Sequence, residues 1–132
     1  MTAGALTEVP LGLELTFPNR PPCRIELGGL PCGRLVRQLA EALLDRTNTA
    51  GTVKAPVTAR GYASTIRHLA RHLGARGFEG GVVELTEALV FDYWRLCGPM
   101  HENHSRVLLT QVDERRPGVL QPSLVAQLAG VR

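Results

Sequence analysis

The chain lacks the features of a secreted, membrane-spanning or disulfide-stabilised protein. Its 132 residues form no apolar run near the roughly 18 residues of a bilayer span. No basic side chain precedes the first apolar residues, and Glu8 and Glu14 follow early, so a signal peptide is not indicated. The cysteines Cys23, Cys32 and Cys97 are odd in number and widely spaced, which argues against a disulfide framework. We expect a cytoplasmic, single-domain protein with reduced thiols.

Acidic residues are absent from one long stretch, TARGYASTIRHLARHLGARG (Thr58–Gly77), which holds four arginines and two histidines. Residues 79–92 show the opposite pattern, with four acidic residues and no basic residue. The net charge is only +3, from 15 basic and 12 acidic residues. The uneven distribution, more than the total, therefore predicts a basic patch on one side of the domain.

Hydrophobic periodicity predicts four main helices, at residues 34–46, 58–76, 86–97 and 102–115, and one more short helix at 122–129. Thr58 and Thr86 are the expected N-caps of the second and third helices, and Gly77 is expected just past the end of the second. Alternating apolar residues in LELTF and CRIEL, on either side of PNRPP, predict a short hairpin. Residues 1–10 show no periodicity and are expected to be loose. The predicted core includes Ile66, Leu69, Leu73, Leu89, Tyr93, Trp94, Leu108 and Val112.

The second helix is predicted to carry two opposite stripes. Tyr62, Ile66, Leu69 and Leu73 recur at core-facing spacing, and the polar set Arg60, Ser64, Arg67 and Arg71 has the same spacing. At about 100° per residue the two sets are offset by roughly 200°, so the arginines should point outward in a line. Such a face is either simply solvated or suited to phosphate contacts.

No active site is evident in the sequence. Cys97, His101 and His104 are residue types that bind zinc, but their spacing crosses a Gly-Pro helix end and no fourth ligand is near. A catalytic dyad of Cys97 with either histidine lacks an orienting group and an oxyanion turn. The glycine-containing stretches GGLPCG and GFEGG match neither a P-loop nor a dinucleotide-binding fingerprint. We expect no bound metal, no cofactor and no small-molecule substrate.

Four segments carry a family resemblance: TARGYASTIRHLARHLGARG, LTEALVFDYWRLCG, HENHSRVLLTQVDER and GVLQPSLVAQLAG. Together they resemble the N-terminal core-binding domain of tyrosine recombinases (phage integrases), most closely the actinobacterial type. Thr58 and Tyr62 match the family's basic helix, Leu85-Thr86 the next helix, and His104-Ser105-Arg106 the start of the last. The likeness runs from about Leu27 to Gly130 and rests on helix patterns rather than on invariant chemistry.

The resemblance implies an all-α fold, a compact four-helix SAM-like bundle that clamps one side of duplex DNA. Residues 1–30 would be an extension with a β-hairpin, 31–130 the DNA-binding domain, and 131–132 the start of a linker. The family's catalytic domain, with its tyrosine nucleophile, is not represented in the chain, so we expect no enzymatic activity.

The expected partner is double-stranded DNA, together with other recombinase protomers bound to it. Expected DNA contacts are Lys54, Thr58, Arg60, Ser64, Arg67, Arg71, His101, Asn103, His104, Ser105 and Arg106. The alternative is a helical protein–protein interaction module: either an adaptor, or a self-associating module that uses exposed apolar surface of the hairpin.

Overall fold

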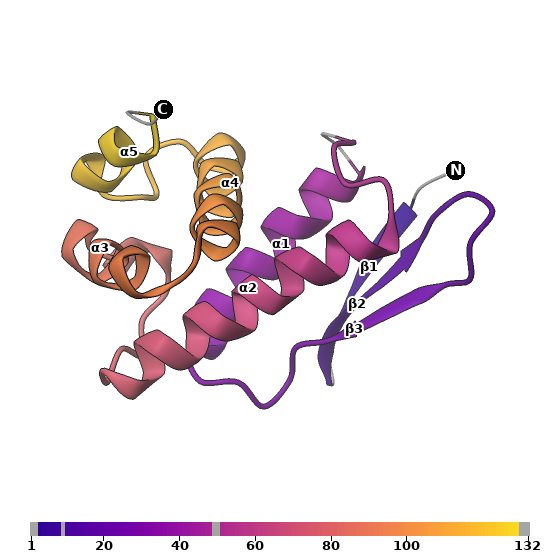
Figure 1. The fold of residues 1–132 in the computed structure, drawn as a ribbon, viewed down its shortest axis with the longest axis horizontal. Coiled ribbons are helices and arrows are strands. Elements are labelled where there is room, and N and C mark those ends of the chain that lie inside the picture. Colours follow the sequence, from indigo (N-terminus) through magenta and orange to yellow (C-terminus); the bar gives the residue numbers. More distant parts are fainter. Residues whose placement is uncertain (1–2, 9, 49–50, 130–132) are drawn as a thin grey trace.

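The computed structural model describes residues 3–8, 10–48 and 51–129, and this part of the chain contains both strands and helices (Figure 1). The strands are β1 (Ala3–Glu8), β2 (Leu11–Thr16) and β3 (Cys23–Glu26). The helices are α1 (Gly33–Asn48), α2 (Pro56–Ala75), α3 (Glu87–Leu96), α4 (Pro99–Arg115) and α5 (Pro122–Ala129), with a 3-10 turn η1 (Val82–Glu84) before α3. The prediction of an all-α four-helix bundle is therefore wrong, and the fold is mixed α/β.

The three strands form one antiparallel sheet in the order β1-β2-β3. The predicted hairpin is confirmed by the pairing of β2 with β3, in which Leu13 lies opposite Ile25. β1 was not predicted, because AGALTE does not alternate apolar and polar residues. It pairs along its whole length with β2 and packs against α1, so long-range contacts and not local pattern determine this strand.

Side chains from the helices bind backbone carbonyls on both edge strands. Asn48, the last residue of α1, donates from Nδ2 to the carbonyl of Gly4 in β1 at 3.1 Å. Arg67 of α2 donates to the carbonyl of Glu26 in β3 at 2.8 Å. Edge strands present unpaired backbone groups, so these two bonds partly cover the edges of the sheet.

The elements are arranged in three layers, which Figure 1 shows as the sheet, then α1 and α2, then α3, α4 and α5. The apolar side chains of the hairpin are buried in one cluster with those of the helices. Leu15, Phe17 and Ile25 are each at most 2% exposed. These three side chains therefore offer no exposed apolar surface to the self-associating form of the protein-interaction alternative. Of the predicted helical core residues, all are buried except Leu89, which is half-buried.

The predicted helix positions are confirmed, but two helices begin two or three residues earlier than expected. α2 begins at Pro56 and α4 at Pro99, because proline suits the first helical position, where its missing N–H is not needed. Thr58 therefore lies inside the first turn of α2, whose N-cap is Ala55. At the C-terminal end of α2, Gly77 has φ +82° and its N–H bonds to the Gly74 carbonyl, as in a Schellman motif.

The predicted start of α3 is also confirmed. Thr86 is the N-cap and accepts a hydrogen bond from the Leu89 N–H at 3.2 Å. Leu85 and Val90 on either side of this cap are both buried, as expected for a hydrophobic staple. Among the helices described, none has the length and apolar character needed to cross a membrane.

Candidate nucleic-acid interface

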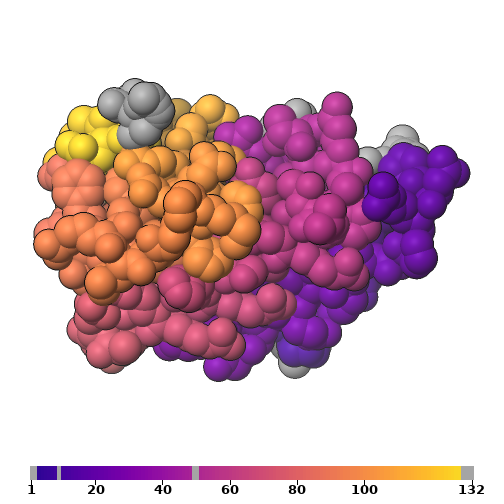
Figure 2. Space-filling model, viewed as in Figure 1, coloured from indigo at the N-terminus to yellow at the C-terminus, as the bar shows by residue number. Residues whose placement is uncertain are grey.

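The outer face of α2 carries a line of exposed polar and basic side chains. Arg60, Ser64 and Arg71 are exposed, and the residues between them that point inward are buried in the core. Arg60 and Arg71 are 11 positions apart, which corresponds to about 16 Å along a helix that rises 1.5 Å per residue. In Figure 2, α2 forms a band of the visible face between the sheet and α4. We call Arg60, Ser64 and Arg71 the α2 basic face.

The two arginines of the α2 basic face have no carboxylate partner in the described part of the chain. The ion pairs found there involve other basic side chains, including Arg24, Arg37, Arg76 and Arg106. The exposed side chains of Arg20, Lys54 and Arg116 likewise have no ion pair there. The guanidinium groups of Arg60 and Arg71 are consequently available to an external anion.

Arg67 shares the spacing of these residues but has a different environment. It is half-buried, and its guanidinium donates to the Glu26 carbonyl of β3. The sequence could not indicate this contact, since it depends on where the sheet packs. Arg67 therefore joins α2 to the edge of the sheet.

The remaining expected contacts on α2 and α4 differ in exposure. Lys54 and Thr58, near the start of α2, are exposed, and so is Asn103 in the first turns of α4. His101 and His104 are half-buried, with their rings directed toward α2, where both contact Thr65.

Ser105 and Arg106 face the interior of the protein. Ser105 is buried and accepts a 2.8 Å hydrogen bond from the indole N–H of Trp94. Arg106 stacks on Trp94, with its guanidinium carbon 3.8 Å from the ring centroid. Its N–H groups also bind the Glu102 carboxylate and the Gln127 carbonyl. A buried tryptophan usually finds a hydrogen-bond partner, and this requirement could have pointed to Ser105.

All four histidines of the chain lie close together where α2 meets α3 and α4. We call His68, His72, His101 and His104 the histidine cluster. His68 and His101 stack at a centroid distance of 4.4 Å with 15° between their planes, and His104 packs on Tyr62 at 4.2 Å. Nδ1 of His68 lies 2.8 Å from the Tyr93 hydroxyl.

Burial favours the neutral form of three of these rings. It is the main cause of the lowered pKa of His72, His101 and His104. Charge repulsion acts in the same direction: Arg76 disfavours the protonated form of His72, and a proton on His68 or His104 disfavours that of His101. Burial also raises the pKa of the Tyr93 hydroxyl well above its usual range. His72, His101 and His104 are therefore uncharged at neutral pH.

Several surface charges elsewhere are paired. On the outer side of the sheet, Arg24 pairs with Glu14 and Glu26. At the end of α2, Arg76 pairs with Asp92 at 2.6 Å. Of the acidic residues in 79–92, Asp92 is the one that pairs with the end of α2, and in the described part of the chain none of them pairs with Arg60 or Arg71.

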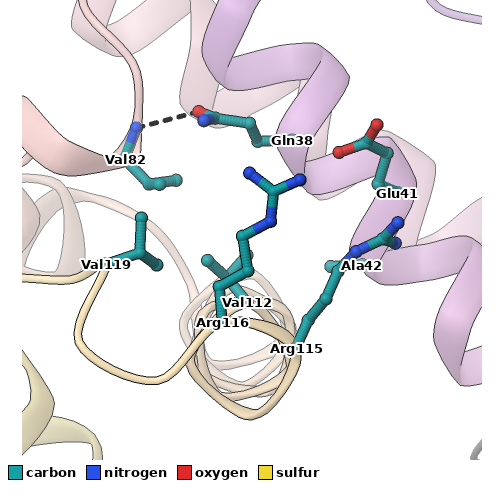
Figure 3. Close-up of a pocket in the computed structure, with 8 residues that line it drawn as sticks. All are labelled: Gln38, Glu41, Ala42, Val82, Val112, Arg115, Arg116 and Val119. Atoms are coloured by element: carbon teal, nitrogen blue, oxygen red, sulfur yellow. Dashed lines mark hydrogen bonds between the residues drawn. The ribbon is translucent and has the colours of Figure 1, made fainter.

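A small hollow between α1, η1 and the end of α4 shows no arrangement of catalytic groups (Figure 3). Its volume is about 30 Å³, which is room for a water molecule and not for a substrate. Gln38 accepts a hydrogen bond from the Val82 N–H at 2.9 Å, and Arg115 pairs with Asp45. In Figure 3 the Arg116 guanidinium points toward Gln38 and Glu41.

The cysteines are free thiols, of which Cys23 and Cys32 are buried and Cys97 is half-buried. Burial raises the pKa of Cys32 and Cys97, which keeps both thiols protonated and unreactive at neutral pH. Among the residues described, no group of three or more histidine, cysteine, aspartate or glutamate side chains is arranged to hold a metal ion.

Comparison of the chain with protein-family models, with curated proteins and with solved structures gave no match. The class that the structure defines is a mixed α/β domain with a three-stranded antiparallel sheet on one side of five helices, within the part of the chain described.

Proposed function

We propose that this protein binds duplex DNA through the α2 basic face. The observation that carries the proposal is the pair Arg60 and Arg71, which are exposed and lack ion-pair partners among the described residues. Arginine is well suited to phosphate because its planar fork donates two parallel hydrogen bonds. Ser64 lies between the two arginines and offers a hydroxyl donor to the same backbone.

Lys54, Thr58 and Asn103 extend the proposed surface. Lys54 and Thr58 lie near the amino end of α2, and Asn103 comes from the neighbouring helix α4. Ser105, Arg67 and Arg106 make internal contacts, so the proposal assigns them to the support of this surface and not to phosphate binding.

The resemblance to recombinase core-binding domains supports a role in holding DNA for integration or recombination, with no catalysis by this chain. That part of the proposal depends on the sequence segments alone. DNA binding by the α2 basic face has separate support in the exposure and charge of its arginines.

The test is the salt dependence of binding to a labelled duplex. Each phosphate neutralised contributes about 0.9 to the slope of log affinity against log salt concentration, so Arg60→Ala/Arg71→Ala should flatten the slope by about 1.8. The matched control is Arg20→Ala/Arg34→Ala, which removes the same charge from exposed positions away from α2. The control should keep nearly the wild-type slope. Equal slopes for all three proteins would refute the proposal.

A protein-interaction role is the second candidate, favoured by apolar side chains around the α3–α4 corner. Leu96 is 66% exposed and Met100 50% exposed, and Phe91 lines a hollow with Trp94 and Arg106. If this surface is the functional one, Leu96→Ser/Met100→Ser should abolish self-association or partner binding in sedimentation experiments and leave duplex affinity unchanged.

A further inference from the structure

The histidine cluster joins three helices through hydrogen bonds and ring contacts that depend on its protonation state. His101 and His104 come from the first half of α4, and His68 and His72 from the second half of α2. We propose that the cluster is a proton-sensitive contact, in which neutral rings hold α4 against α2 and protonation in mildly acidic solution loosens that packing.

The central atom of this contact is the hydroxyl oxygen of Thr65. It is fully buried and lies 2.7 Å from Nδ1 of His101 and 3.2 Å from Nδ1 of His104. With neutral rings, the hydroxyl can donate to one Nδ1 and accept from the other, so all three groups are satisfied. When both rings are protonated, each Nδ1 becomes a donor, and two cations face one oxygen while the hydroxyl proton loses its acceptor.

The stacking of His68 on His101 opposes protonation for a second reason. Two imidazolium rings at a centroid distance of 4.4 Å would repel each other at a site that is partly shielded from water. His68 also contacts Tyr93, whose hydroxyl stays protonated and therefore offers no compensating negative charge.

Few carboxylates are placed to offset the added charge. The titratable and charged groups that face the cluster are Tyr62, Arg76, Asp92, Tyr93, Cys97 and Glu102, with Arg46 of α1 beyond Tyr62. Asp92 contacts His72, but it also pairs with Arg76 and Arg95. Glu102 is held by Arg106. His101 and His104 have no carboxylate partner among the residues described.

The direction of the pH effect follows from these contacts. The pKa of His101 and of His104 is lowered below the 6.5 of an unperturbed histidine, mainly by burial. The unfolded chain therefore takes up protons first as the pH falls through 6.5, and the folded state loses stability. The stabilising contribution is present above that pH and declines as the solution becomes acidic.

The size of the effect can be bounded. For each histidine that stays neutral in the folded state, the unfolding equilibrium constant should rise by up to about 30-fold between pH 7.5 and pH 5. Carboxylates contribute little here, because unperturbed aspartate and glutamate titrate near pH 4.

Urea unfolding between pH 7.5 and pH 5 tests the proposal with wild type, His101→Gln/His104→Gln and the control Glu114→Gln. Glutamine can still bond to Thr65 but cannot become charged, whereas Glu114 is an exposed residue of the same helix. Between pH 7.5 and pH 5 we expect the folding equilibrium constant of wild type and of Glu114→Gln to fall at least tenfold. The folding equilibrium constant of the double variant should fall much less. Equal losses in all three would overturn the proposal.

Two measurements on wild type apply even if the double variant does not fold. NMR titration should give His101 and His104 pKa values below 6.5, and values at or above 6.5 would overturn the proposal. Hydrogen exchange gives a second test, in the ratio of amide exchange rates in α4 to those in α1, corrected for intrinsic rates. This ratio should be higher at pH 5.5 than at pH 7.5. An unchanged ratio would mean that protonation does not loosen α4, which would contradict the proposed contact.

Discussion

Replacing Arg106 with alanine should lower the stability of the fold by about 3 kcal/mol, although the side chain was expected from the sequence to contact DNA. Only 18% of the Arg106 side chain is exposed. The substitution removes a stacking contact with Trp94, a bond to the Gln127 carbonyl in α5 and an ion pair with Glu102.

The magnitude comes from these three interactions taken together. A hydrogen bond that involves a charged group contributes about 1.5–3 kcal/mol, and a partly buried cation–π contact about 1 kcal/mol. The ion pair on the outer side adds less than about 1 kcal/mol. Such contributions are not additive, so we take about 3 kcal/mol for the sum. At about 2.1 cal/mol/K per residue, 132 residues correspond to an unfolding entropy near 0.28 kcal/mol/K, and Tm should fall by about 11 °C.

Thermal and urea unfolding of Arg106→Ala should be compared with Arg60→Ala, a substitution of the same type at an exposed position. We expect Arg60→Ala to change stability by less than about 0.5 kcal/mol and to weaken duplex binding. Arg106→Ala should show the reverse, with a large loss of stability and an unchanged salt slope at temperatures where it remains folded. A stable Arg106→Ala protein with weakened DNA binding would refute this division between structural and phosphate-binding arginines.

Three further substitutions test contacts elsewhere in the structure by urea unfolding. Arg67→Ala should destabilise by about 1–2 kcal/mol through loss of its bond to the Glu26 carbonyl, and a cost equal to that of Arg71→Ala would contradict the contact. Gly77→Ala should cost about 1 kcal/mol because φ is +82°, and no cost would mean that the turn has another conformation. Thr86→Ala should cost about 1 kcal/mol by removing the cap of α3, and Thr86→Ser should restore most of it.

The helices could be predicted because their signals are local. Apolar residues recur at helical spacing in each helix. Gly77 marks the C-terminal end of α2 and Thr86 the start of α3, and each signal lies within a few residues of the boundary that it sets. The start of α2 was misplaced because Thr58 was preferred as a cap over Pro56 as the first helical residue. Errors of this kind move a boundary by one turn or less and do not change the fold.

The fold class was wrong because the sheet depends on contacts that are distant in sequence. β1 has small and polar residues with no apolar alternation, and it is held by β2 together with bonds from α1 such as Asn48 to Gly4. The hairpin β2–β3 was recognised, but it was treated as an appendage. Its residues Leu13 and Phe17 instead belong to the same core as the helices.

The candidate site was predictable where it depends on spacing within one helix, and not where it depends on contacts between distant segments. Helical spacing placed Arg60, Ser64 and Arg71 on the outer face of α2, where they are exposed. Spacing within one helix could not show that β3 reaches Arg67. The histidine cluster was also missed as a unit, although His68 and His72 are four residues apart and His101 and His104 three, spacings that place each pair on one helix face.

Because some arginines make internal contacts, fewer of them are available to phosphates, and this limits how strongly the chain can bind DNA. The guanidinium group binds a backbone carbonyl in Arg67 and a carboxylate in Arg106. In Arg60 and Arg71 we propose that it binds phosphates, so residue type alone does not distinguish these roles. With Lys54 included, three cations are available on the proposed surface, and the salt slope should not exceed about 2.7. Proteins that make 6–10 phosphate contacts have much steeper slopes, of about 5–9. A single copy should therefore bind duplex DNA weakly, and tight binding would require additional basic surface from further protomers on the same DNA.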